Sequence, residues 1–168
     1  GKKIKDIELI SNEEENRILS EFNRTYAEYP MNKTTHEIFE EQVERIPGNI
    51  AVVCGEGKIS YKELNEKANQ LARLLRAKGV KPDDFVGIMS DQSIELIVGI
   101  MGILKAGAAF VPIDPPYPEA RISYVYENSG STIILSKKYL GKSGSFGGEI
   151  IDLDDDPIYT GDAKNLPK

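Results

Sequence analysis

The sequence predicts an α/β fold in which a mostly parallel sheet carries helices on both faces. From Phe85 onward, short apolar stretches at 85–89, 108–113 and 132–135 alternate with segments of helical character. These connecting segments are long enough for the right-handed crossovers that parallel strands require. The three apolar stretches carry no charge, as strands covered on both faces should. The chain has 168 residues, 40% of them hydrophobic, so it can bury one core.

Two amphipathic helices are expected ahead of this core. Residues 11–14, Ser-Asn-Glu-Glu, have the spacing of a capping box, and apolar side chains within 18–22 share one helical face. This first helix ends before the turn-rich segment 23–33. The same capping pattern opens a second helix at 34–37, Thr-Thr-His-Glu, and the Pro-Gly pair at 47–48 ends it.

A hairpin and a long helix come next. Residues 50–54 and 58–61 flank a Gly-Glu-Gly turn and indicate two antiparallel strands. Cys54 lies in the first of these apolar strands and is interpreted as a small core residue rather than a reactive thiol. A third capping box opens a helix at Ser60, and Gly79 closes it. The apolar face of this helix comprises Leu64, Ala68, Leu71, Ala72 and Leu75.

The helix expected at 94–105 contains two glycines, Gly99 and Gly102. A glycine inside a helix costs about 1 kcal/mol relative to alanine, so we expect both to permit close packing against a neighbouring element. Ile97 on this helix and Leu71 on the preceding helix are expected to be buried where the helices flank the sheet.

The stretch 104–118 combines a helix end, a strand and a rigid exit. Gly107 offers the left-handed turn that ends a helix. The strand comes next at 108–113, where Pro112 has no N–H to donate and weakens regular pairing. Three further prolines stiffen the loop after the strand. Open α/β sheets bind ligands at strand ends of this kind.

Two glycine-containing segments are candidates for a phosphate site. Such a loop needs free backbone N–H groups, usually a lysine, and a helix immediately after it. At Ser129-Gly-Ser-Thr132 the order is reversed, because a helix (119–128) precedes the glycine and a strand comes after it, so Gly130 is interpreted as a helix cap. Residues 142–148 contain a lysine but have no helix after them, and are interpreted as a surface loop before a weak strand at 150–153.

The remaining candidate side chains also favour structural interpretations. His36, the single histidine, lies in the first turn of a helix, where the positive end of the helix dipole disfavours an imidazolium. Glu37 projects in a different direction, so no acid–base pair is expected. No metal-ligand cluster is visible, and the acidic run 154–156 is interpreted as solvated. The sequence therefore predicts no catalytic, cofactor-binding or metal-ligating residue in this chain.

Composition narrows the class of protein. A net charge of −6 argues against nucleic-acid binding, which needs a basic face. One cysteine excludes an internal disulfide and fits a reducing compartment. The N-terminal lysines have no apolar region after them, so no signal peptide is expected. The longest apolar helix, 94–104, is far shorter than the roughly 20 residues of a membrane span, and a cytoplasmic location is expected.

Two stretches resemble core motifs of the amino-acid adenylation domains of nonribosomal peptide synthetases, within the superfamily of adenylate-forming acyl-CoA synthetases and luciferases. Residues 59–65, Ile-Ser-Tyr-Lys-Glu-Leu-Asn, and matching side chains within 68–71 resemble the first motif. Residues 104–114 resemble the second motif, with Phe110 where tyrosine is more usual. Residues 115–122 resemble the family's segment directly after that motif.

The resemblance implies a domain organisation. Residues 34–42 resemble the opening helix of the family, and residues 1–33 resemble the linker from a preceding condensation domain. Residues 34–168 would then be an incomplete, N-terminal portion of an adenylation domain. In the family a lysine-containing, Ser/Thr/Gly-rich loop that grips the nucleotide phosphates comes next, and Pro167 stands about where that loop would begin.

The resemblance also implies a function for the parent protein. Such an enzyme activates an amino acid with Mg-ATP as aminoacyl-AMP and loads it onto the phosphopantetheine of a carrier domain, in the biosynthesis of secondary metabolites such as antibiotics. Its partners would be the rest of the adenylation domain and the carrier and condensation domains. The chain alone is expected to lack cofactors and activity, and to self-associate. Two alternatives stay open: half of a split adenylation enzyme, and a non-catalytic interaction module that reuses the fold.

Overall fold

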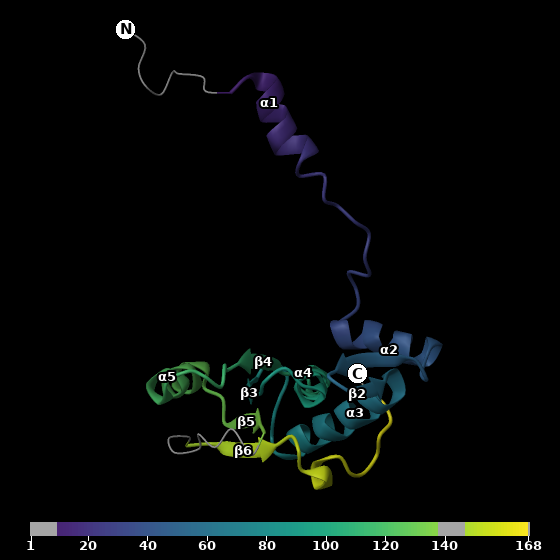
Figure 1. The fold of residues 1–168 in the computed structure, drawn as a ribbon, viewed down its shortest axis with the longest axis vertical. Coiled ribbons are helices and arrows are strands. Elements are labelled where there is room, and N and C mark those ends of the chain that lie inside the picture. Colours follow the sequence, from purple (N-terminus) through teal and green to yellow (C-terminus); the bar gives the residue numbers. More distant parts are fainter. Residues whose placement is uncertain (1–9, 138–146, 168) are drawn as a thin grey trace. The chain divides into compact units, whose positions relative to one another are not determined.

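The computed structural model describes residues 10–137 and 147–167 (Figure 1). The chain divides into two units, Gly1–Lys33 and Thr34–Lys168, which are described separately.

In the first unit, described from residue 10 onward, a short helix begins where the sequence predicts. α1 (Asn12–Asn16) is capped by Ser11, whose Oγ accepts a hydrogen bond from the Glu14 backbone N–H, while the Glu14 carboxylate accepts one from the Ser11 N–H. The helix continues into a π-helical turn, η2 (Arg17–Glu21). The sequence predicts an apolar face on this helix, and the side chains of that face are exposed: Ile18, Leu19 and Phe22.

The second unit combines a parallel sheet with an antiparallel hairpin. In the sheet the strand order is β4-β3-β5-β6, and each neighbouring pair is parallel. The hairpin pairs β1 with β2. In chain order the elements are α2 (Thr35–Arg45), β1 (Ile50–Cys54), β2 (Gly57–Ser60), α3 (Tyr61–Ala77), β3 (Phe85–Met89), α4 (Ile94–Ala106), β4 (Ala109–Pro112), α5 (Glu119–Ser129), β5 (Ile133–Ser136), β6 (Glu149–Asp152) and the 3-10 turn η4 (Asp156–Ile158). The predicted parallel sheet is confirmed.

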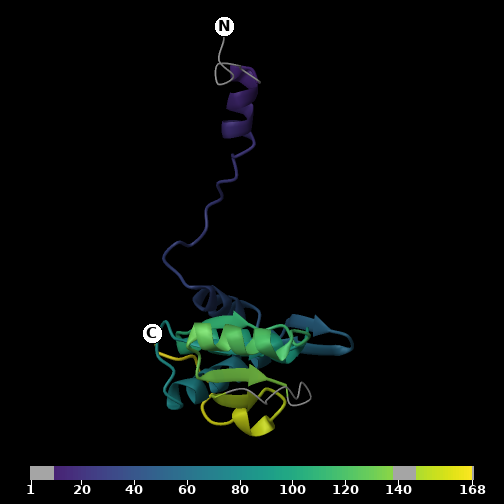
Figure 2. The same ribbon diagram turned by 90° about the vertical axis from the view of Figure 1, so that its left-hand side faces the viewer.

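Helices cover both faces of the sheet, as the sequence predicts. Neighbouring residues of a strand face opposite sides. Accordingly, Ile88 of β3 is buried in the cluster formed with α3 and α4, whereas Met89 is buried with Ile122 of α5. In β5, likewise, Leu135 is buried on the side of α3 and α4, and Ile134 is buried on the side of α5. Figure 1 shows α3 and α4 on one side of the strands and α5 on the other, and Figure 2 has α5 in front.

Close packing explains the two glycines inside α4. A Cβ at Gly102 would lie 2.7 Å from Cδ2 of Leu71, and one at Gly99 would lie 2.7 Å from Cδ1 of Ile88. Leu71 is fully buried, as expected. The expectation for Ile97 is wrong: it is half-buried, and Val98 is buried instead. With 3.6 residues per turn, adjacent side chains of a helix lie about 100° apart, so the expected buried face is displaced by one position.

The strand predicted at 108–113 is confirmed, but the prediction that it is covered on both faces is wrong. Gly107 has a φ of 95° and ends α4 with the expected left-handed cap. β4 then lies at the edge of the sheet, where Phe110 is 39% exposed. An apolar, uncharged sequence does not distinguish an edge strand from a central one. The edge position suits Pro112, which has no N–H to donate to a second neighbour.

The prediction that Cys54 is a core residue is also wrong. The hairpin β1-β2 is separate from the parallel sheet, and Ala51 and Val52 are the residues of β1 that pack against the core. Val53 is 59% exposed and Cys54 is exposed. The Cys54 Sγ donates a hydrogen bond to the backbone oxygen of Gln92 at 3.3 Å. The apolar run at 50–54 therefore marks a strand of which only one part reaches the core.

Candidate functional site

The carboxyl ends of the parallel strands meet at one edge of the sheet, which is where open α/β sheets bind ligands. Residues 90–93 leave this edge after β3, residues 113–118 after β4, and Lys137 after β5. The Lys137 Nζ lies 2.9 Å from Oε2 of Glu95, at the start of α4, and 3.2 Å from Oδ1 of Asp154, after β6. One ammonium therefore joins the ends of three elements at this edge.

The charge of Lys137 is well stabilised. Burial on its own would lower the pKa of this ammonium, but the hydrogen bonds and charges of Glu95 and Asp154 outweigh burial and raise the pKa of Lys137. Burial likewise opposes the charge of Glu95, yet the hydrogen bond from Lys137 lowers the pKa of that carboxyl. Residues 154–156 are exposed as predicted, and Asp154 is in addition part of an ion-pair group.

A hollow of about 290 Å³ opens at the same edge, between α4 and the edge strand β4. Its lining is mainly apolar, and Ser90, Asp114 and Tyr117 are the lining residues whose side chains carry polar groups. The lining residues are Ile88, Ser90, Leu96, Ile100, Phe110, Pro112, Ile113, Asp114 and Tyr117. These residues form an apolar wall beside the ligand-binding edge and offer little to hold a charged ligand.

The glycine–serine turn between α5 and β5 is a helix cap, as the sequence predicts. Gly130 has a φ of 64° and ends α5. The buried Ser131 Oγ donates to the backbone oxygen of Ile133 at 2.7 Å and accepts from the Gly87 N–H at 3.1 Å. The Ser131 N–H donates to Oγ of Ser129. These groups are engaged within the protein, so the turn does not fit a phosphate.

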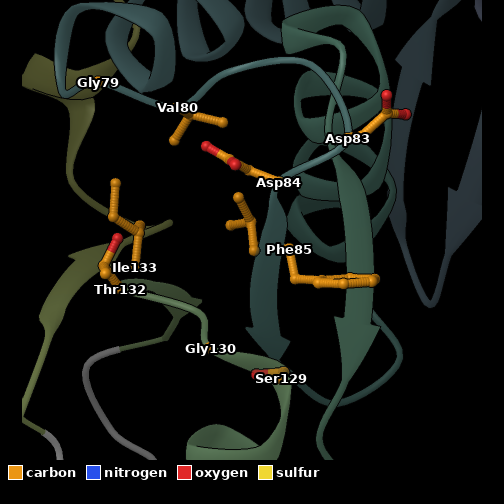
Figure 3. A pocket seen from close by; sticks show the side chains of 10 residues that line it. Gly79, Val80, Asp83, Asp84, Phe85, Ser129, Gly130, Thr132 and Ile133 are labelled. Carbon is orange, nitrogen blue, oxygen red and sulfur yellow. The ribbon is translucent and has the colours of Figure 1, made fainter.

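A cavity of about 240 Å³ lies at the opposite edge of the sheet, beside the turns that lead into β3 and β5 (Figure 3). Figure 3 shows the Asp84 carboxylate directed toward Val80, with the Asp83 carboxylate directed away from it. Asp84 Oδ2 accepts the backbone N–H of Lys81 at 2.8 Å. Because its charged lining is acidic, this cavity does not suit a phosphate either.

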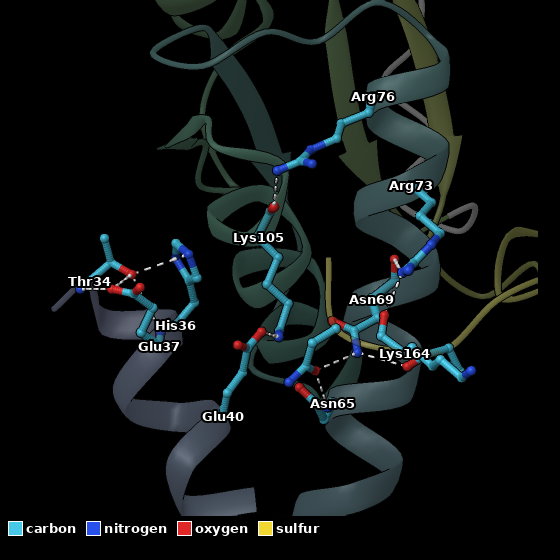
Figure 4. A network of polar contacts seen from close by, with 12 residues as sticks. Thr34, His36, Glu37, Glu40, Asn65, Asn69, Arg73, Arg76, Lys105 and Lys164 are labelled. Atoms are coloured by element: carbon cyan, nitrogen blue, oxygen red, sulfur yellow. Dashed lines mark hydrogen bonds and ion pairs between the residues drawn. The ribbon is translucent and has the colours of Figure 1, made fainter. Parts of the chain in front are cut away.

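Polar side chains cross α3 in a stripe that faces the C-terminal segment (Figure 4). We call Asn65, Asn69 and Arg73 the α3 polar stripe; they are four residues apart and therefore share one face of the helix. Asn65 is 8% exposed and Asn69 is 0% exposed. Asn69 Nδ2 donates to the backbone oxygen of Ala163 at 2.8 Å and to Oδ1 of Asn165 at 3.0 Å. Asn65 Nδ2 donates to the same Oδ1 at 2.9 Å.

Arg73 completes the stripe with contacts to the same segment. Its Nη1 donates to the backbone oxygen of Lys164 at 2.6 Å, and its Nη2 lies 3.1 Å from Oδ2 of Asp162. The stripe therefore binds residues 162–165 through backbone and side-chain acceptors. The Oδ1 atoms of Asn65 and Asn69 are buried and have no hydrogen-bond partner within the described part of the chain.

Lys105 is a buried cation at the end of α4. Its side chain is 1% exposed and pairs with Glu40 of α2. Burial lowers the pKa of Lys105, and the contact with Glu40 opposes that effect. Arg76 of α3 donates to the backbone oxygens of Lys105 and Ala106, at 3.0 and 3.1 Å. The C-terminus of α4 is thereby tied to both α2 and α3 (Figure 4).

The surroundings of His36 fit the structural role that the sequence predicts. Its Nε2 lies 3.2 Å from Oγ1 of Thr34, in the capping turn of α2. Burial lowers the pKa of His36, although the charge of Glu40 acts in the opposite direction. The carboxylate of Glu37 accepts the backbone N–H of Thr34 and so belongs to the cap.

Other candidate features give no site. In residues 10–137 and 147–167, no group of three or more histidine, cysteine, aspartate or glutamate side chains is arranged to hold a metal ion. Residues 142–146 of the glycine-rich segment lie outside the described residues, so its interpretation as a surface loop stays a prediction. Each helix in the described ranges is too short or too polar to cross a membrane.

Comparison with known proteins identifies the family. A family model described as "AMP-binding enzyme" matches residues 39–165, so the chain belongs to this family. Gramicidin S synthase 2 of Brevibacillus brevis is 51% identical over 164 residues, which are 98% of this chain and 4% of that protein. Bacitracin synthase 3 of Bacillus licheniformis is 57% identical over 137 residues, 82% of this chain and 2% of that protein. The chain spans a small share of the relatives that it matches.

Solved structures agree with this family. The nonribosomal peptide synthetase FmoA3, in an AMPPNP-bound form, is 29% identical with a TM-score of 0.80, over 90% of this chain and 16% of that one. The N-terminal subdomain of Klebsiella oxytoca NpsA is 26% identical with a TM-score of 0.69, over 81% of this chain and 35% of that one. The chain thus has the sequence and fold of the first part of a nonribosomal peptide synthetase adenylation domain.

The α3 polar stripe, which binds residues 162–165, was not predicted from the sequence. Asn65 and Asn69 were noted in the sequence only as matches to a family motif. A signal was present, because both asparagines adjoin the apolar positions of a long amphipathic helix. A buried amide needs hydrogen-bond partners, and such a pair indicates that another segment covers the helix there. The identity of that segment, about a hundred positions later in the chain, has no local signal.

Proposed function

We propose that this chain is the N-terminal structural part of an adenylation domain whose complete form activates an amino acid. In that form, Mg-ATP and the amino acid yield aminoacyl-AMP, and the acyl group passes to the phosphopantetheine of a carrier domain. The observation that carries the proposal is the extent of the match, which covers residues 39–165 in the family and 98% of the chain in gramicidin S synthase 2.

We further propose that residues outside this chain bind the nucleotide. FmoA3 has solved forms with AMPPNP and with α-methyl-L-serine-AMP. In the chain itself the polar groups of the Ser129–Thr132 turn are internally engaged, and the cavity next to it is acidic. In this proposal the chain supplies a scaffold, contributes no catalytic, cofactor-binding or metal-ligating residue, and is inactive alone.

The proposal includes the organisation and partners of the parent protein. Residues 1–33 would be the linker from a condensation domain and residues 34–168 the incomplete adenylation domain, and the division of the structure between Lys33 and Thr34 supports this boundary. The partners are the rest of the adenylation domain and the carrier and condensation domains of a cytoplasmic synthetase. Self-association of the isolated chain belongs to the same proposal.

Amino-acid-dependent exchange of pyrophosphate into ATP tests the proposed function. The chain alone, the separately prepared remainder of the domain, their mixture and the continuous domain are assayed with a panel of amino acids. We expect exchange by the continuous domain and none by the isolated chain. Exchange by the mixture would identify a domain that assembles from two pieces. A continuous domain without activity toward any amino acid would contradict the proposal and favour the non-catalytic interaction module.

A further inference from the structure

We propose that the α3 polar stripe positions the nucleotide-binding segment of the complete domain, an inference that rests on the proposed function. Asn65, Asn69 and Arg73 would do so by fixing the course of residues 162–165, so that the chain after Pro167 starts from a defined place and direction. In this proposal they are positioning residues, because they act through the segment that they hold and not on the substrate.

The first argument is that the segment has no regular structure of its own. Residues 161–165 form neither helix nor strand. The stripe contributes hydrogen bonds and an ion pair to Asp162, Ala163, Lys164 and Asn165, and Gln70 of α3 adds one from its Nε2 to the backbone oxygen of Gly161 at 3.2 Å. Acceptors on every residue from 161 to 165 are therefore held by one rigid helix.

The second argument is that two of these acceptors on the segment define its backbone path directly. The carbonyl of Ala163 accepts from Asn69, and the carbonyl of Lys164 accepts from Arg73. Contacts to main-chain carbonyls fix the course of a segment regardless of its side chains. Leu166, the next residue after the segment, packs against the main hydrophobic core. The chain thus reaches Pro167 between a polar anchor and an apolar anchor.

The third argument concerns the unused acceptors of the stripe. The Oδ1 atoms of Asn65 and Asn69 are buried without a partner among the described residues. A buried acceptor without a donor is unfavourable, whereas an apolar side chain at either position would avoid this loss. The chain thus keeps two amides at these positions although they are unfavourable for stability, which fits a role in holding the C-terminal segment through their Nδ2 groups rather than a role in core packing.

Paired variants of α3 separate positioning from general stability. Asn69→Leu removes both side-chain hydrogen bonds of Asn69 while keeping a similar side-chain volume. Arg73→Lys, at a less buried position, replaces the guanidinium, which contacts Lys164 and Asp162 through two nitrogens, with a single ammonium. Lys78→Met is the matched control, because Lys78 lies at the end of the same helix with a similar exposure but pairs with Glu149 of β6. Circular dichroism checks that each variant is folded.

Two measurements decide the outcome. In the 168-residue chain, hydrogen exchange of the Lys164 N–H, which donates to Asp162 Oδ1, should be about tenfold faster in both stripe variants than in the control. In the continuous adenylation domain, pyrophosphate exchange should show a KM for ATP about tenfold higher, or about 1.4 kcal/mol of lost binding, with kcat within about twofold.

Three results would overturn the inference or its basis. Stripe variants with the KM of the wild type would refute the positioning role while leaving the proposed function intact. An equal rise of KM in Lys78→Met would show that lost stability, and not the stripe, is responsible. A wild-type continuous domain without exchange activity would refute the proposed function itself and this inference with it.

Discussion

The contact between Leu71 of α3 and Gly102 of α4 allows a quantitative test of how these helices pack. Leu71 is fully buried, so Leu71→Ala should lower the free energy of unfolding by about 2–5 kcal/mol. At Gly102 a Cβ would lie 2.7 Å from Cδ2, 2.9 Å from Cγ and 3.1 Å from Cβ of Leu71. Overpacking of this kind costs about 1–3 kcal/mol. Alanine returns about 1 kcal/mol of helix propensity, so the net cost of Gly102→Ala is about 0–2 kcal/mol.

The double variant should reveal the contact. In Leu71→Ala the atoms Cγ and Cδ2 are absent, so of the three atoms nearest to the added Cβ at position 102 only the Cβ of residue 71, at 3.1 Å, remains. Gly102→Ala should then stabilise the protein by up to about 1 kcal/mol, and the two effects should deviate from additivity by about 1–3 kcal/mol.

Urea unfolding monitored by circular dichroism measures all four free energies of this cycle. Gly48→Ala is the control, because a Cβ there has no atom within 4 Å. Combined with Leu71→Ala, it should add to within about 0.5 kcal/mol. Additivity of the Leu71 and Gly102 substitutions within that same limit would refute the close approach of α3 and α4.

The remaining predictions concern the buried cation and the exposed surface. Glu40→Gln should destabilise the protein by about 3–5 kcal/mol, because it leaves the almost fully buried Lys105 ammonium without its carboxylate. Lys105→Met removes the charge itself and should destabilise the protein less. Equal urea midpoints of the two variants would contradict this ranking. Burial lowers the pKa of Lys105, so at a pH just below the ordinary lysine pKa of about 10.4 the unfolded chain binds more protons than the folded chain. The free energy of unfolding should therefore rise with pH in this range, most steeply in Glu40→Gln. Exposed apolar side chains such as Phe110 and Val53 should make the isolated chain self-associate at high concentration, with residues 1–33 as the segment most readily exchanged between copies. Light scattering over a concentration series checks this, and a strictly monomeric particle would contradict it.

Local chemistry accounts for the parts of the fold that the sequence predicted. Three capping boxes, beginning at Ser11, Thr34 and Ser60, mark helix starts, and the left-handed glycines Gly107 and Gly130 mark helix ends. Each of these signals depends on contacts within about four residues, so a sequence carries them completely. The hairpin is also a local structure, because its paired residues lie three to ten positions apart in the sequence.

Tertiary context accounts for the parts that the sequence did not predict. The exposure of Cys54 depends on how far the hairpin reaches from the core, and the exposure of Phe110 on which strand lies at the sheet edge. Neither exposure can be predicted from an apolar run, because both depend on elements that lie elsewhere in the sequence. The contacts of the stripe join residues far apart in the sequence, such as Asn65 and Asn165, which only the folded chain brings together.

Calorimetric titration of the 168-residue chain with Mg-ATP tests most directly whether this part of the adenylation domain is a scaffold without a nucleotide site. The continuous domain serves as the positive control and should bind the nucleotide. For the isolated chain we expect no binding heat at nucleotide concentrations that saturate the control, because the polar groups of the Ser129–Thr132 turn are engaged within the protein and the cavity beside it is acidic. A dissociation constant in the micromolar range for the isolated chain would contradict this expectation and place a nucleotide site within these residues.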